Sequence, residues 1–206
     1  MTMPIPRRPA FGRRSLMLSG GAALAAAGLG RVSVARAAES PSSDPTTIRL
    51  AARPGRAPLV GPPHPDTGIW GYDGGVPGPE IRVRQGERLR VVLENRLPEE
   101  TTIHWHGVRL PNAMDGVPHL TQDPVPPGGT FAYEFDVPDA GTFWYHPHAR
   151  GFEQVARGLH GALVVEEREP PPTVDRDATW VLGDWRLLED ASIRDDFGRR
   201  HDLAHA

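Results

Sequence analysis

The chain has 206 residues, a formal net charge of −3 and no cysteine. This length predicts one complete domain plus a remainder, and the interspersed acidic and basic residues do not indicate a nucleic-acid partner. The lack of cysteine excludes disulfides, thiolate metal ligands and a cysteine nucleophile within these residues. It also excludes a blue-copper electron-transfer site here, because such a site needs a cysteine thiolate.

Residues 1–37 have the pattern of an export signal. Arg13 and Arg14 precede an apolar Gly- and Ala-rich run that reaches about Gly30, and Ala35-Arg36-Ala37 fits an A-x-A cleavage site. The run is shorter than the ~20 apolar residues of a membrane span. The arginine pair predicts the twin-arginine route, with an ordinary secretory signal as the alternative. We therefore expect a periplasmic or secreted protein without a membrane span after signal removal.

Residues 38–46 are rich in Ser and Pro and predict a flexible linker. Residues 47–167 then form a series of short apolar runs with Pro- and Gly-rich connections, the first of them at 53–66 and a long loop at 108–129. Strands are expected at 47–52, 68–72, 81–84, 88–97, 101–106, 131–137, 142–145 and 161–166. Short strands at regular spacing, with almost no helical periodicity, predict an all-β sandwich or barrel.

The last part of the chain differs in composition. Residues 168–177 contain three consecutive prolines and predict an interdomain linker. A new strand is expected at 179–185, so residues 178–206 are interpreted as the truncated start of a second domain. A segment of this length cannot bury a core of its own.

Two His-x-His pairs carry the chemistry. His104 and His106 flank a tryptophan, and His146 and His148 flank Pro147. In a strand, residues two apart leave the same face roughly 6.5–7 Å apart, so each pair presents two imidazoles together. One ion takes ligands at about 2 Å, so two or more ions bridged between the pairs fit this spacing better than one.

The type of ion stays open at this point. An all-nitrogen ligand set suits copper, zinc, iron or nickel and disfavours magnesium or calcium. A single histidine beside an aromatic residue would more simply be a buried, hydrogen-bonded side chain; two pairs of equal spacing favour metal binding. The remaining histidines lack a paired strand spacing and are not expected to be ligands: His64, His119, His160, His201 and His205.

Several motifs together resemble the amino-terminal cupredoxin domain of the multicopper oxidases, which include laccases and periplasmic cuprous oxidases. The resemblance covers nearly all of residues 47–187. It rests on the two histidine pairs, the Tyr72–Pro79 turn, the Asn112–Pro118 segment, Gly158-Leu159-His160-Gly161 and the Asp184-Trp185 pair. It implies a Greek-key β-sandwich of the cupredoxin type for residues 47–167.

The resemblance also implies roles for individual residues. His104 would bind the type 2 copper, and His106, His146 and His148 would bind the type 3 copper pair of a trinuclear cluster. Asp115 matches an acidic residue that supplies protons during oxygen reduction; an Asp-Gly turn residue is the simpler interpretation. The whole oxidase would oxidise a small phenol-like substrate or cuprous ion and reduce O2 to water.

The chain departs from the family in one respect. Family members carry further histidines and the type 1 copper cysteine in a carboxy-terminal domain, and this chain has neither. We therefore expect an incomplete chain, inactive alone, whose remaining domains complete the oxidase. The main alternative is a non-catalytic periplasmic copper-binding module; a structural envelope protein is disfavoured because all four histidines are present.

Overall fold

The computed structural model describes residues 44–170 and 172–197. Contacts divide the chain after Ser40, and every described residue belongs to the second unit, Pro41–Ala206. The predicted signal at 1–37 lies outside the described residues, and so do most of the 38–46 linker, His201 and His205. No helix in the described part has the length and hydrophobicity needed to cross a bilayer.

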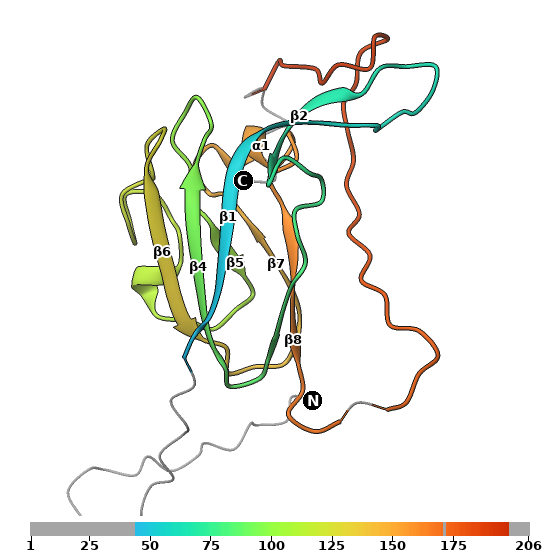
Figure 1. Cartoon of the computed structure of the whole chain (residues 1–206). Coiled ribbons are helices and arrows are strands. Elements are labelled where there is room, and N and C mark those ends of the chain that lie inside the picture. Colours follow the sequence, from blue (N-terminus) through green and yellow to red (C-terminus); the bar gives the residue numbers. More distant parts are fainter. Residues whose placement is uncertain (1–43, 171, 198–206) are drawn as a thin grey trace, which may run out of the picture. The chain divides into compact units, whose positions relative to one another are not determined.

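Two four-stranded sheets dominate this unit, and Figure 1 shows how their strands are arranged. The first has the order β2-β1-β4-β6, with β1 at Thr46–Ala57, β2 at Thr67–Tyr72, β4 at Arg88–Asn95 and β6 at Thr130–Asp136. The second has the order β3-β8-β7-β5, with β3 at Ile81–Arg84, β5 at His104–His106, β7 at Gly141–His146 and β8 at Gly161–Glu166. The two helical elements among the described residues are single turns, η1 at Asn112–Met114 and α1 at Gly151–Gln154. The all-β prediction is confirmed.

The core forms between the two sheets because strands alternate apolar and polar residues. In β4, Leu89, Val91 and Leu93 are fully buried while the residues between them are not. Aromatic rings from both sheets meet there: the ring of Trp105 in β5 lies 5.7 Å from that of Tyr133 in β6. Burying a large apolar side chain stabilises the fold by about 1.5–3 kcal/mol, so these positions hold the two sheets together.

The structure corrects the predicted connection at 53–66, because β1 continues to Ala57. β1 pairs with β4 over residues 46–52 and with β2 over 52–57. Pro54 therefore has a neighbouring strand on one side only, where a missing N–H is tolerated. A Cβ on Gly55 would overlap the carbonyl of Gly74, so glycine serves here for close backbone approach rather than for a turn.

The strand expected at 179–185 is not formed. No residue of this segment joins a ladder within the described chain, and the one bridge nearby pairs Leu187 with Ile193. Trp180 and Leu182 are 85% and 90% exposed. An apolar strand-like sequence forms a strand only when its backbone groups find a partner, and that partner is lacking among residues 44–170 and 172–197. The division of the chain into domains stays a prediction.

Candidate metal centre

The histidine pairs meet where β5 and β7 lie side by side. The antiparallel register places His104 opposite His146 and His106 opposite Trp144. β5 is three residues long, shorter than the predicted 101–106 strand. Between the two histidines, Trp105 points into the core and is fully buried. Period-two alternation therefore turns both imidazoles of β5 to the other face, as predicted.

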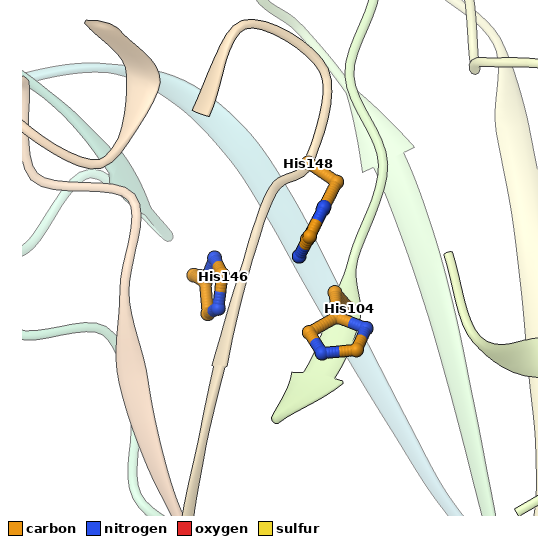
Figure 2. Close-up of side chains that lie close together, drawn as sticks. All are labelled: His104, His146 and His148. Carbon is orange, nitrogen blue, oxygen red and sulfur yellow. The ribbon is translucent and has the colours of Figure 1, made fainter. Parts of the chain in front are cut away.

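The four imidazoles converge. Figure 2 shows His146 and His148 at the point where β7 ends, with His104 on the neighbouring β5. The ligand nitrogens of these three residues all lie within 4.8 Å of one another. His106 joins them, because its Nδ1 lies 3.3 Å from Nε2 of His146. The structure thus brings together every histidine of the two predicted pairs.

Hydrogen bonds orient two of the rings. His104 Nδ1–H donates to the backbone carbonyl of Asp115 at 2.7 Å, and His146 Nδ1–H donates to the carbonyl of Pro147 at 3.0 Å. A carbonyl oxygen only accepts, so Nδ1 must carry the proton in both rings. Nε2 is therefore the unprotonated nitrogen that could bind a metal in His104 and in His146, an arrangement that carbonyl acceptors commonly impose on ligand histidines.

Burial favours the neutral form of His146 and His148. His146 is only 8% exposed, and burial lowers its pKa to about 3, assisted by the neighbouring histidines and opposed by the hydrogen bond to Pro147. Burial also lowers the pKa of His148, with a further contribution from His104. A neutral imidazole is the form that binds metal, so these two rings are ligand-ready at neutral pH.

Trp144 covers one side of the centre. Its ring stacks on His146 with centroids 3.8 Å apart and an interplanar angle of 22°, and it lies 4.9 Å from the ring of His106. This contact was not predicted from the sequence. It could have been, because residues 144 and 146 leave the same face of a strand.

Asp115 reaches the centre through its backbone and its side chain. Beside the carbonyl contact, Asp115 Oδ1 lies 3.3 Å from His104 Nδ1. The next residue explains the close approach: Gly116 has φ +76°, and a Cβ there would overlap the carbonyl of Ile103. The predicted 108–129 loop therefore passes directly against the start of β5, and glycine permits it to do so.

The donor atoms fit a metal ion. Two nitrogens bound to one tetrahedral ion at 2.0–2.1 Å would be about 3.3–3.4 Å apart, and His106 Nδ1 and His146 Nε2 are 3.3 Å apart. The set contains only imidazoles, which suit copper and other late first-row metals. Because the rings come from two strands, ions held there would link β5 to the end of β7.

The other described histidines stand apart from this cluster. His64 and His119 are exposed loop residues, and His119 has φ +62°. His160 is partly buried, and its Nδ1 has no hydrogen-bond partner in the described part of the chain; burial lowers its pKa. None of the three belongs to the group of histidines that could hold an ion.

Comparison with known proteins identifies the family. Residues 60–170 match the family model described as multicopper oxidase. Copper resistance protein A of Escherichia coli is 44% identical over 114 residues, which are 55% of this chain and 18% of that protein. Multicopper oxidase MmcO of Mycobacterium tuberculosis is 38% identical over 167 residues, 81% of this chain and 31% of that protein.

Solved structures agree with the sequence comparison. The multi-copper oxidase of Pseudomonas parafulva superposes with a TM-score of 0.66 at 49% identity, covering 71% of this chain and 35% of that one. That of Pseudomonas thermotolerans gives 0.61 at 54% identity, covering 64% and 32%. The likeness confirms the cupredoxin-like sandwich.

The chain spans between 18% and 31% of the length of four curated relatives that it matches, three copper resistance proteins A or homologues and MmcO. The matched family model covers more than half of it, including both histidine pairs and Asp115. This chain belongs to the multicopper oxidase family, whose cofactor is copper.

Proposed function

We propose that these residues supply part of the oxygen-reducing copper centre of a multicopper oxidase. His104 would hold the type 2 copper, and His106, His146 and His148 would hold the type 3 pair. The observation that carries the proposal is the convergence of four imidazoles from two strands, with His106 Nδ1 and His146 Nε2 at 3.3 Å. Remaining ligands would come from residues outside this chain.

Bound copper would supply electron transfer and the reduction of O2 to water, while groups of this chain would orient the ligand histidines and supply protons. The carbonyl of Asp115 and that of Pro147 fix the rings of His104 and His146. The Asp115 carboxylate, 3.3 Å from His104 Nδ1 and partly exposed, would pass protons from solvent to the centre. A carboxylate held beside the site is suited to such general acid–base work.

The partners proposed for the whole oxidase are O2 and a small reductant, either phenol-like or cuprous ion. Relatives from Pseudomonas syringae and Escherichia coli are named for copper resistance, which supports cuprous ion. The export pattern at residues 1–37 supports a periplasmic or secreted protein, with the twin-arginine route the finer proposal.

Copper uptake by the purified chain tests the centre. We expect copper to bind tightly to the wild type, and its electron spin resonance spectrum to show nitrogen coordination. His104→Ala and His146→Ala should each reduce the bound copper, because each removes a converging imidazole. His64→Ala is the matched control: it removes an exposed histidine outside the cluster and should leave uptake unchanged.

Two outcomes would contradict the proposal. Copper binding that survives loss of both His104 and His146 would show that copper sits elsewhere. Tight copper binding without any contribution to oxygen reduction, after the chain is joined to the remaining domains of a relative, would favour the non-catalytic copper-binding module.

A further inference from the structure

His148 lies outside the ladder that pairs β5 with β7. The β5–β7 ladder ends at the His104–His146 pair, and His148 lies two residues further on, after Pro147. Proline has no N–H and cannot extend a ladder. Yet the ring of His148 lies with its centroid only 4.4 Å from that of His104, so something else must fix the backbone at position 148.

Thr102 occupies the position that would face His148. Since His104 faces His146, the same antiparallel register continued by two residues pairs 102 with 148. Thr102 is fully buried, and its Oγ1 accepts a hydrogen bond from the backbone N–H of His148 at 3.2 Å. The threonine hydroxyl thus takes the place of a ladder carbonyl at the point where the ladder stops.

A second contact ties the chain after His148 to the chain before His104. Gln154 in α1 is fully buried, and its Oε1 accepts a hydrogen bond from Thr101 Oγ1 at 2.7 Å. Its Nε2 donates to Glu99 Oε1 at 2.8 Å and to the Glu100 carbonyl at 2.9 Å. A buried amide with these three partners is costly to displace.

The two contacts bracket a short segment. At one end, the backbone of His148 is hydrogen-bonded to Thr102. At the other end, the side chain of Gln154 is hydrogen-bonded to Thr101 and Glu99. Between them the backbone turns sharply, because Arg150 has φ +47° and caps α1. Side-chain contacts therefore anchor residues 148–154 to the segment that precedes β5.

We propose that Thr102 and Gln154 are positioning residues for His148. Thr102 fixes the position of the His148 backbone relative to His104, and Gln154 keeps the following turn close to residues 99–101. The inference deepens the proposed function and rests on it, because it takes His148 as a copper ligand. Neither residue belongs to the histidine cluster that would hold the metal; both act through the segment that carries this ligand.

The test compares Thr102→Val with Thr102→Ser. Valine keeps the shape and removes the hydroxyl, whereas serine keeps the hydroxyl. We expect Thr102→Val to bind copper(II) on the order of tenfold more weakly in competition titrations, as is usual when a group supporting a ligand is lost. Thr102→Ser should restore binding close to wild type, and Gln154→Met should weaken it as Thr102→Val does.

A second readout needs no metal. In the metal-free chain, amide hydrogen exchange of His148 should become faster in Thr102→Val and not in Thr102→Ser. Thr67→Val is the matched control, because Thr67 is also buried and donates its hydroxyl to the Ala191 carbonyl at 2.7 Å, away from the centre. It should leave both copper affinity and His148 exchange unchanged.

The inference is overturned if Thr102→Val leaves His148 exchange and copper affinity unchanged, or if Thr67→Val weakens copper binding equally. Should the wild type bind no copper, the proposed function fails on its own, and the exchange measurement still decides the inference. Unchanged exchange in Thr102→Val would then reject it, and faster exchange confined to that variant would support it. If Gln154→Met does not fold, the Thr102 pair keeps the test complete.

Discussion

Gly116 shows how a single residue sets the position of the metal centre. With φ +76°, it lies in the left-handed region, and a Cβ would overlap the carbonyl of Ile103. We expect Gly116→Ala to destabilise the chain by about 2 kcal/mol or more, since strain at such a position costs 1–3 kcal/mol even without an overlap. The loop would also withdraw the Asp115 carbonyl from His104. Urea unfolding and copper titration measure the two effects.

Gly128 is the control that distinguishes the strain of a positive φ from the overlap of an added Cβ with its neighbours. It has the same φ of +76°, but nothing lies within 4 Å of the position that a Cβ would take. Gly128→Ala should therefore cost about 1–2 kcal/mol from the left-handed conformation alone and should not affect copper binding. Equal losses in the two variants would show that the approach to Ile103 is unimportant.

Asp115 offers a test of proton supply that leaves its backbone contact in place. Asp115→Asn keeps the carbonyl that accepts from His104 Nδ1 and removes only the ionisable group. In a complete oxidase that carries this segment, we expect oxygen consumption to fall by about a hundredfold or more, the usual effect of losing a general acid–base group. Copper content should be unchanged. A normal rate in Asp115→Asn would leave the residue as a turn residue that orients His104.

At the scale of elements, the one-turn helix α1 depends on a buried carboxylate. Glu153 is 7% exposed and contacts the guanidinium groups of Arg150 and Arg157. Burial alone would raise the pKa of Glu153, but the hydrogen bonds from the two arginines outweigh it and lower the pKa below 4.5. Arg157 in turn lies over the rings of Trp70 and Phe197, at 4.8 and 4.9 Å.

The sign of the pH dependence follows from that lowered pKa. In acid the unfolded chain takes up a proton on Glu153 before the folded chain does, so the stabilisation is complete above about pH 4.5 and is lost as the pH falls below it. We expect Glu153→Gln to lower the free energy of unfolding by about 2 kcal/mol at pH 7 and by less near pH 3. Urea unfolding at several pH values measures the difference.

The control for this prediction is Glu94→Gln. Glu94 pairs with Arg96 at 2.8 Å, but both side chains are about half exposed, and exposed pairs contribute little. Its substitution should leave stability nearly unchanged at both pH values. A pH-independent loss in Glu153→Gln would mean that packing, rather than charge, holds α1.

The elements that the sequence predicted well are those whose period is visible locally. β4 and β6 alternate buried apolar residues with more exposed ones as expected, and the same period predicted that His104 and His106 leave one face of their strand. The end of β1 was missed because Pro54 and Gly55 signal a turn, while a single-sided ladder and a close backbone contact decide their conformation. Thr102 and the Asp115 carbonyl could not be predicted, because their roles depend on the β5–β7 register and on a loop path.

At the scale of the whole molecule, the segment after residue 178 shows the limit of local patterns. Its apolar residues predicted a strand, but no ladder forms there in the described chain, because strand pairing needs a second backbone. Trp180 and Leu182 line a cleft of about 740 Å³ together with Phe152, His160, Trp185 and Phe197. The cleft therefore exposes apolar side chains in the described part of the chain.

Large exposed apolar side chains favour self-association of a protein in solution. We expect the chain to associate as its concentration rises, and the double change Trp180→Ser and Leu182→Ser to reduce that association. Because the two side chains are 85% and 90% exposed, the double variant should unfold at the same urea concentration as the wild type. Sedimentation velocity over a concentration series measures the association. Leu120→Ser is the control, since Leu120 is 78% exposed in a separate loop and should not alter it. Association that persists in the double variant would place the contact on another face.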